Sequence, residues 1–250
     1  MALQEELEEQ GVWLFRYRST LPLILLFMGG FFFVMTKLNP NSFFLEETPC
    51  EVYYEMVCLL VSLLGLAVRI YTVGHTPENT SGRNVHGQLA DSLNTTGFYS
   101  VVRHPLYVGN FLMWLGPALL TGNFWFATVF ILFYWVYYER IMFAEEQFLR
   151  GKFGQTYLDW SKNVPAFIPS FKNFVKPNLT SSLKKILKKE KNGLAAVFII
   201  FFIFEFTGEL IQGKHDFNYF IMAGCVLSVI AYLVLRYLKR NTSVLDEHGR

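Results

Sequence analysis

Six long apolar runs dominate this sequence and constrain its fold more than any other feature. A helix needs about 20 apolar residues to cross a bilayer core of about 30 Å, and about 17 is the lower limit. The runs lie at 20–36, 53–72, 106–121, 123–138, 193–208 and 218–237. Hydrophobic residues make up 52% of the chain and 26 residues are Phe, which is more than the core of a soluble domain of this length would bury. We therefore expect an all-α integral membrane protein with about six transmembrane helices.

The positively charged residues predict which way the helices run. If successive helices alternate in direction, all but two of the 22 Lys and Arg residues fall on one side, the exceptions being Lys37 and Lys214. Lys and Arg accumulate on the cytoplasmic side of membrane proteins, so we expect both termini in the cytoplasm. The first ten residues are acidic and no small-residue cleavage site follows the first apolar run, so we expect that run to be retained as an anchor.

Two segments between the apolar runs are long enough to carry function. They span residues 73–105 and 139–192, and both are expected on the cytoplasmic side. The second ends in LTSSLKKILKKEKN, which is typical of a solvated linker held near anionic lipid; a lipid-binding helix is the alternative. We divide the chain into a membrane core at 1–170, a basic cytoplasmic linker at 171–192, and an appended transmembrane helical pair with its tail at 193–250.

The composition and motifs also indicate what the chain does not do. The net charge is only +2, which suggests neither a nucleic acid nor an acidic partner. Cys50, Cys58 and Cys225 lie far apart without a CxxC pair or a nearby His, so we expect no metal site. The chain has no GxGxxG, Walker loop, HExxH or GxSxG. A nucleotide-like cofactor would therefore bind in a non-Rossmann pocket.

The stretch GFYSVVRHPLYVGN, residues 97–110, places charge at the start of the third apolar run. Pro is favoured at the first position of a helix, so we expect Pro105 to begin the helix and His104 to occupy its N-cap. The free N–H groups and the dipole at a helix start attract anions. With Arg103 and His104 they predict a niche for a carboxylate or phosphate. The simpler alternatives are that Arg103 anchors the helix at the membrane surface and that His104 is only a cap.

Two other features near this membrane face allow either a functional or a structural role. Pro105, Gly109 and Gly116 fall broadly on one helical stripe, where a ligand or another helix could approach closely. Arg69 lies near the end of the second apolar run. An ionisable residue there is a functional candidate, and extension of its side chain to the membrane surface is the alternative.

A second charged stretch follows the fourth apolar run and begins ERIMFAEEQFLRGKFG. Arg140, Glu145 and Glu146 lie within two turns of the expected membrane boundary. Glu146 and Arg150 are four residues apart, so an ordinary surface ion pair is the simple interpretation of these two. The Phe153-Gly154 pair predicts a turn that returns the chain to the membrane surface.

The order of these motifs resembles the isoprenylcysteine carboxyl methyltransferase superfamily, which also includes phospholipid methyltransferases. The elements are G-F-Y-x-x-x-R-H-P-x-Y-x-G, a short helical hairpin, R-x(4)-E-E-x(6)-F-G-x-x-Y and V-P-x-F-I-P, and they cover residues 55–170. The resemblance implies a membrane-embedded enzyme that uses S-adenosylmethionine. It also implies a cofactor pocket that faces the cytoplasm and a lipid-like substrate that arrives from the bilayer.

The resemblance also implies roles for individual residues. The residues that match the cofactor pocket are Tyr99, Arg103, His104, Tyr107, Gly109 and Glu146. The residues that match the catalytic positions are Arg140 and Glu145, and Arg69 matches a residue that handles the polar end of the substrate. The loop before the first motif varies in the family, so Arg83, Asn84 and His86 receive no role.

The implied function is S-adenosylmethionine-dependent methyl transfer to the carboxylate or phosphate of a lipid or lipidated substrate. Such an acceptor is already ionised and needs positioning more than a general base, and arginine suits that task through bidentate contacts. A phospholipid amine acceptor is an alternative, because a glutamate could take its proton.

Two other functions are considered. Membrane sterol reductases that use NADPH carry a related R-H-x-x-Y-x-G element, but they usually show R-D-E-x-x-C where this chain has A-E-E-Q-F-L. That difference favours methyl transfer. A membrane protein that keeps the scaffold without catalysis is the third possibility.

Overall fold

The structure is a computed structural model, and it describes residues 2–39, 41, 43, 45, 48–78, 80, 90–213, 217–247 and 249. Lys214, Arg83, Asn84 and His86 therefore lie outside the described residues. The helices are α1 (Leu3–Arg16), α2 (Leu21–Leu38), α3 (Glu51–Gly74), α4 (Pro105–Leu120), α5 (Phe124–Phe153), α6 (Gln155–Ser161), α7 (Leu183–Gln212) and α8 (Tyr219–Asn241). Two short 3₁₀ turns, η2 (Gly97–Ser100) and η3 (Phe171–Asn173), complete the described elements.

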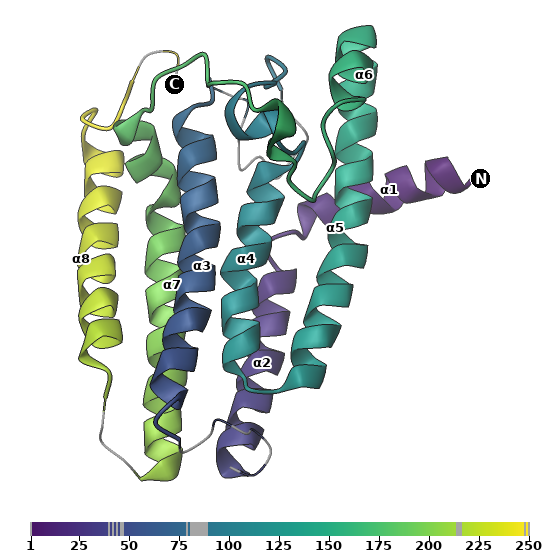
Figure 1. Ribbon diagram of the computed structural model, residues 1–250. Helices are drawn as coiled ribbons and strands as arrows, with labels where there is room; N and C mark the ends of the chain where they lie inside the picture. Colours follow the sequence, from purple (N-terminus) through teal and green to yellow (C-terminus); the bar gives the residue numbers. More distant parts are fainter. Residues whose placement is uncertain are drawn as a thin grey trace.

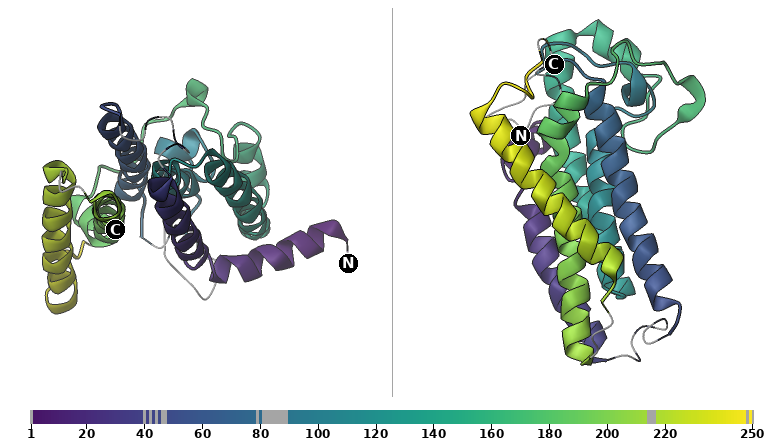
Figure 2. Two further views of the ribbon diagram at one scale, coloured as in Figure 1. Left: turned by 90° about the horizontal axis from the view of Figure 1, so that it is seen from below. Right: turned by 90° about the vertical axis from the view of Figure 1, so that its left-hand side faces the viewer.

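The predicted all-α membrane architecture is confirmed. Within the described residues, α3, α5, α7 and α8 are long and apolar enough to cross a bilayer, and α2 and α4 are shorter apolar helices. These helices form an elongated bundle, with α8 at its edge beside α7 (Figures 1 and 2). The tight α4–α5 hairpin is as expected, because Gly122 has a φ of 63° and Asn123 accepts a hydrogen bond from the Phe126 N–H at 2.8 Å.

Small residues bring α3 and α4 together. A Cβ added at Gly65 would overlap the carbonyl oxygen of Gly109, and one added at Gly116 would overlap Ser62 Oγ. Ser62 Oγ also donates to the Met113 carbonyl at 2.9 Å. Helices in a membrane associate through such close packing and hydrogen bonding. The glycine stripe of α4 therefore packs against another helix.

The first turns of α7 come from the segment expected to be a linker. The helix begins at Leu183, where Ser182 accepts a hydrogen bond from the Lys185 N–H at 3.1 Å. Lys185 Nζ is buried and donates to the Thr76 carbonyl at 2.6 Å. These contacts dock the basic turns on the end of α3. The alternation of basic and apolar residues thus belongs to a packed helix.

The apolar part of α7 lies in the middle of the bundle. Phe201 and Phe204 are buried in one hydrophobic cluster with Phe33 of α2 and Leu59 of α3. By contrast, α8 packs mainly against α7. Of the two helices expected to be appended, α7 therefore contributes to the core and α8 covers its outer face.

One helix was not expected from the sequence. The acidic N-terminal residues form α1, which lies across the upper part of α5 in Figure 1. Gly11 is buried there, and a Cβ at this position would overlap the Arg140 carbonyl oxygen. The absence of a side chain at Gly11 lets α1 pack directly on the α5 backbone.

The long connecting segments meet at one end of the bundle. This end holds the start of α4, the end of α5, α6 and the C-terminus (Figure 1). Backbone hydrogen bonds hold the segment after α6 against η2 and the start of α4: the Arg103 N–H donates to Pro165 O at 2.8 Å, and the Gly97 N–H donates to Val175 O at 2.9 Å. The charged motifs are therefore gathered at this end.

Candidate functional site

The two charged motifs meet between the start of α4 and the end of α5. Pro105 opens α4 and His104 occupies its N-cap, as expected, but the His104 side chain does not cap the helix. Instead His104 Nε2 lies 3.0 Å from Glu146 Oε1, and Arg103 Nη1 donates to Glu146 Oε2 at 2.7 Å. The anion in the predicted niche is thus the chain's own Glu146. The alternative pairing of Glu146 with Arg150 is wrong.

Tyr107 links the same niche to the second glutamate. Its hydroxyl donates to Glu145 Oε2 at 2.9 Å, and His104 Nδ1 lies 3.7 Å from that oxygen. The rings of His104 and Tyr107 stack with centroids 5.6 Å apart. Tyr134, deep in α5, donates to the Tyr107 carbonyl at 2.9 Å. Adjacent turns of α4 and α5 therefore hold both carboxylates against the imidazole.

Three buried donors near this cluster have no well-formed hydrogen bond among the described residues. They are Arg103 Nε, Tyr157 Oη and Trp160 Nε1. Gly154, with a φ of 54°, ends α5 and turns the chain into α6, so that Tyr157 is only 3% exposed. Burial raises the pKa of Tyr157, and Glu146 raises it further through its negative charge and a weak hydrogen bond, whereas Arg103 lowers it. The Tyr157 hydroxyl is therefore directed at Glu146 and Arg103. The phenol is therefore a proton donor at neutral pH. Buried donors without partners are costly in a folded protein and indicate a place for a ligand.

Tyr99 of η2 has a hydroxyl that is influenced by charged groups of the expected site. Burial raises the pKa of Tyr99, and the negative charge of Glu145 raises it further, whereas a hydrogen bond with Asn94 and the positive charge of Arg69 lower it. Tyr99 is therefore within electrostatic range of both Glu145 and Arg69.

Arg69 of α3 is held by residues of two other helices, Asn110 of α4 and Glu190 of α7. Its guanidinium donates to both carboxylate oxygens of Glu190, at 2.9 and 2.7 Å, and to Asn110 Oδ1 at 2.7 Å. The stem of the side chain crosses Gly109, because a Cβ added there would lie 2.5 Å from Arg69 Cγ. Gly109 thus provides the space in which Arg69 lies.

Arg140 is the one expected site residue that faces away from the cluster. Its Nε donates to Gln10 of α1 at 3.1 Å, and its Nη1 donates to the Val136 carbonyl at 3.1 Å. Arg140 also lines a groove between α1 and α5 with Trp13 and Tyr137. The structure therefore brings Arg103, His104, Tyr107, Glu145 and Glu146 together and places Arg140 on the α1 side of α5.

Glu190, Asn110, Tyr157 and Trp160 are not among the site residues expected from the sequence. Tyr157 ends the motif F-G-x-x-Y and Asn110 follows Gly109 directly, so local signals for both were present. Glu190 had none, because 121 residues separate it from Arg69 and it lies in a run of lysines. Only the docking of α7 on α3 reveals it.

Comparison with known proteins confirms the resemblance to this superfamily. Residues 54–156 match the family model described as phospholipid methyltransferase. The chain is 42% identical over 77 residues to protein-S-isoprenylcysteine O-methyltransferase of Schizosaccharomyces pombe, a match that covers 31% of this chain and 33% of that protein.

Two bacterial relatives differ in their names. The chain is 30% identical over 124 residues to the nickel-cobalt-cadmium resistance protein NccN of Alcaligenes xylosoxydans xylosoxydans, covering 50% of this chain and 55% of that protein. It is 37% identical over 92 residues to methanethiol S-methyltransferase 2 of Bradyrhizobium diazoefficiens, covering 35% and 32%. The matches thus span from about a third to about half of the relatives' lengths. No solved structure matches the chain.

Proposed function

Because residues 54–156 match the phospholipid methyltransferase family, we propose that this chain is an S-adenosylmethionine-dependent O-methyltransferase. The acceptor is the carboxylate or phosphate of a lipid or lipidated substrate, and the site faces the cytoplasm, on the side where the positively charged residues gather. The observation that carries the proposal is the contact of Arg103 and His104 with Glu146. It joins the two family motifs into one site at the end of the bundle.

The residues of the cluster fit this cofactor. S-adenosylmethionine supplies a methyl group on a positively charged sulfonium, and it carries a carboxylate, an ammonium and hydroxyl groups. The cluster holds two carboxylates, Glu145 and Glu146, but one guanidinium, Arg103, which binds Glu146; this balance favours a cationic ligand. The buried donors Arg103 Nε and Trp160 Nε1 suit a ligand that also brings acceptor oxygens.

The two glutamates are suited to different tasks. Both oxygens of Glu146 are engaged, one by Arg103 and one by His104, so Glu146 holds these two residues in place. Among the described residues, Glu145 accepts a hydrogen bond only at Oε2, from Tyr107, and its side chain is 32% exposed. Glu145 is therefore the carboxylate available to hold a cationic group, or to take a proton if the acceptor is an amine.

The acceptor reaches the site from the bilayer beside the apolar part of α4. A carboxylate or phosphate is already ionised at neutral pH, so the chain has to orient it and exclude water. Arg69 is the cation proposed to orient the acceptor. Tyr107, which holds Glu145, is partly buried and packs against the buried Tyr138, so the carboxylates are shielded from the bundle side.

Calorimetry on the purified chain in lipid nanodiscs tests the proposal. We expect S-adenosylmethionine and S-adenosylhomocysteine to bind and NADPH not to bind. Mass spectrometry of total lipids from cells with and without the gene then identifies the acceptor, as one lipid class that gains the mass of a single methylene. Absence of cofactor binding would refute the proposed function, and binding of NADPH instead would favour a reductase.

A further inference from the structure

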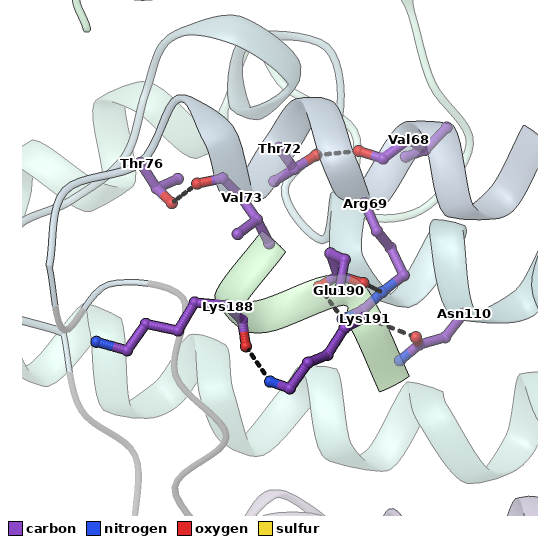
Figure 3. Close-up of polar contacts among 9 residues, drawn as sticks. All are labelled: Val68, Arg69, Thr72, Val73, Thr76, Asn110, Lys188, Glu190 and Lys191. Carbon is purple, nitrogen blue, oxygen red and sulfur yellow. Dashed lines mark hydrogen bonds and ion pairs between the residues drawn. The ribbon is translucent and has the colours of Figure 1, made fainter. Parts of the chain in front are cut away.

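Glu190 of α7 binds one side of the Arg69 guanidinium (Figure 3). Its two oxygens accept from Nε at 2.9 Å and from Nη2 at 2.7 Å, which is the bidentate arrangement that gives arginine–carboxylate pairs their geometric specificity. Asn110 of α4 accepts from Nη1 at 2.7 Å. The pair is buried, with side chains 4% and 12% exposed for Glu190 and Arg69.

The element that delivers Glu190 is itself fixed in place. The Ser182 N–H donates to the Gly74 carbonyl at 2.9 Å, at the end of α3. Lys185 Nζ donates to the carbonyls of Thr76 and Pro77 at 2.6 and 3.1 Å. The first turns of α7 are therefore docked on the same helix that carries Arg69. A carboxylate on such a rigid support can hold a partner side chain in one orientation.

We propose that Glu190 is a positioning residue of the site: it fixes the guanidinium of Arg69 so that the remaining N–H groups receive the anionic end of the acceptor. This inference rests on the proposed function. A guanidinium has five N–H groups, and three hydrogen bonds hold Arg69 in the described part of the chain. One N–H on Nη1 and one on Nη2 are left for a ligand.

The same contacts argue against a gate in which the acceptor displaces Glu190. Displacement would exchange one carboxylate for another and leave Glu190 as a buried charge without a cation, which is strongly unfavourable. Binding of the acceptor beside an intact pair avoids that cost. Glu190 lies outside the matched residues 54–156, so the carboxylate that holds Arg69 comes from a helix beyond the segment that matches the family model.

Binding measurements on the full chain in nanodiscs test this role. The probes are N-acetyl-S-farnesylcysteine, which carries a carboxylate, and its methyl ester, which does not. We expect the wild type to prefer the acid. Glu190→Gln should weaken binding of the acid at least about tenfold, because the cation loses its bidentate partner, with the ester and S-adenosylmethionine bound as before.

A matched control and a second variant keep the test decisive. Glu51→Gln breaks the Lys37–Glu51 pair, which is also poorly exposed and lies at the other end of the bundle, so it should lower Tm without changing acid binding. Asn110→Ala keeps the ion pair and removes one of the three anchors, so it should weaken acid binding by a smaller factor in the same direction. If Glu190→Gln does not fold, Glu190→Asp takes its place: it keeps the negative charge but is one methylene shorter, so it should lose the bidentate contact with Arg69 and also weaken acid binding.

Three results would overturn the inference: equal or no binding of the acid and the ester by the wild type, unchanged acid binding in Glu190→Gln, or tighter acid binding in that variant, which would indicate a gate. Failure of the wild type to bind S-adenosylmethionine is a separate outcome. That result would refute the proposed function itself, whatever the acid and ester do.

Discussion

Glu146 Oε1 lies 3.0 Å from His104 Nε2, although 42 residues separate the two along the chain. The hairpin of α4 and α5 explains the approach, because it returns the end of α5 to the start of α4. Glu146 is thus held by a histidine and an arginine together, and it organises the site around one carboxylate.

Glu146→Gln should disrupt this site more than any other conservative change. The variant leaves Arg103 in a largely buried position without its carboxylate, at a cost of about 3 kcal/mol in unfolding free energy. We expect a lower Tm and at least about a hundredfold loss of kcat/KM for methyl transfer, because two positioned residues are released at once. Thermal unfolding and release of S-adenosylhomocysteine measure the two effects.

Glu139→Gln is the matched control for that change. Glu139 lies on the same helix, two turns earlier, and is exposed. Its replacement should leave both Tm and kcat/KM near the wild-type values. Equal losses in the two variants would mean that the effect belongs to α5 as a whole and not to the contact with His104.

The sequence predicts where the membrane helices lie better than it predicts which helices and side chains pack against one another. Apolar runs and the turn at Gly122 mark the membrane helices, because both signals are local. The lysines at the start of α7 indicate a solvent-exposed linker. In the structure, packing against the end of α3 buries Lys185. The ion pair of Arg69 and Glu190 depends on that packing. No local pattern could have indicated it.

The same contrast between local pattern and tertiary contact applies to the candidate site. The resemblance selected Arg103, His104 and the two glutamates, which the fold brings together. It also selected Arg140, which occupies the neighbouring stretch of sequence but a different face of α5, toward Gln10. Position along the sequence therefore predicts which turn of a helix a residue occupies more reliably than it predicts which residue it contacts.

Tyr107→Phe tests whether the second glutamate has to be held. The change removes the hydrogen bond to Glu145 and keeps the ring that stacks on His104. A hydrogen bond to a charged group contributes about 1.5–3 kcal/mol, so we expect a modest loss of Tm. Activity should fall about tenfold because Glu145 loses its orientation. Steady-state rates with S-adenosylmethionine measure this.

Tyr54→Phe is the comparison for Tyr107→Phe. The Tyr54 hydroxyl donates to the Leu119 carbonyl at 2.6 Å, between α3 and the far end of α4. Its loss should lower Tm by a similar or smaller amount and leave the rate unchanged. A rate loss in Tyr54→Phe as large as in Tyr107→Phe would show that helix packing, and not Glu145, sets the activity.

The raised pKa of Tyr157 predicts how the stability of the chain changes at alkaline pH. Burial, with Glu146 adding to it, raises the pKa of Tyr157 from its ordinary value of 10.0. Above about pH 10 the unfolded chain loses this proton while the folded chain keeps it, so the unfolded state is favoured and stability falls as pH rises. Tyr157→Phe removes this contribution. Tm measured from pH 8 to pH 11 should therefore fall less steeply in Tyr157→Phe than in the wild type. Tyr17→Phe, at an exposed tyrosine, should follow the wild type, and a parallel fall in all three proteins would contradict the assignment.

Gly109→Ala and Gly116→Ala separate helix packing from the position of Arg69. Both glycines lie where α4 meets α3: a Cβ at Gly116 would lie 2.5 Å from the Cys58 carbonyl oxygen, and one at Gly109 would lie 2.9 Å from the Gly65 carbonyl oxygen. Each substitution forces the helices apart, so each should cost about 1–3 kcal/mol of unfolding free energy and lower Tm.

Only the Cβ at Gly109 would also meet the stem of Arg69, at 2.5 Å. We therefore expect Gly109→Ala to weaken binding of N-acetyl-S-farnesylcysteine beyond the effect of Gly116→Ala, even where the two variants have the same Tm. If the two variants bind this acid equally well, the glycine at 109 serves packing alone and Arg69 tolerates displacement.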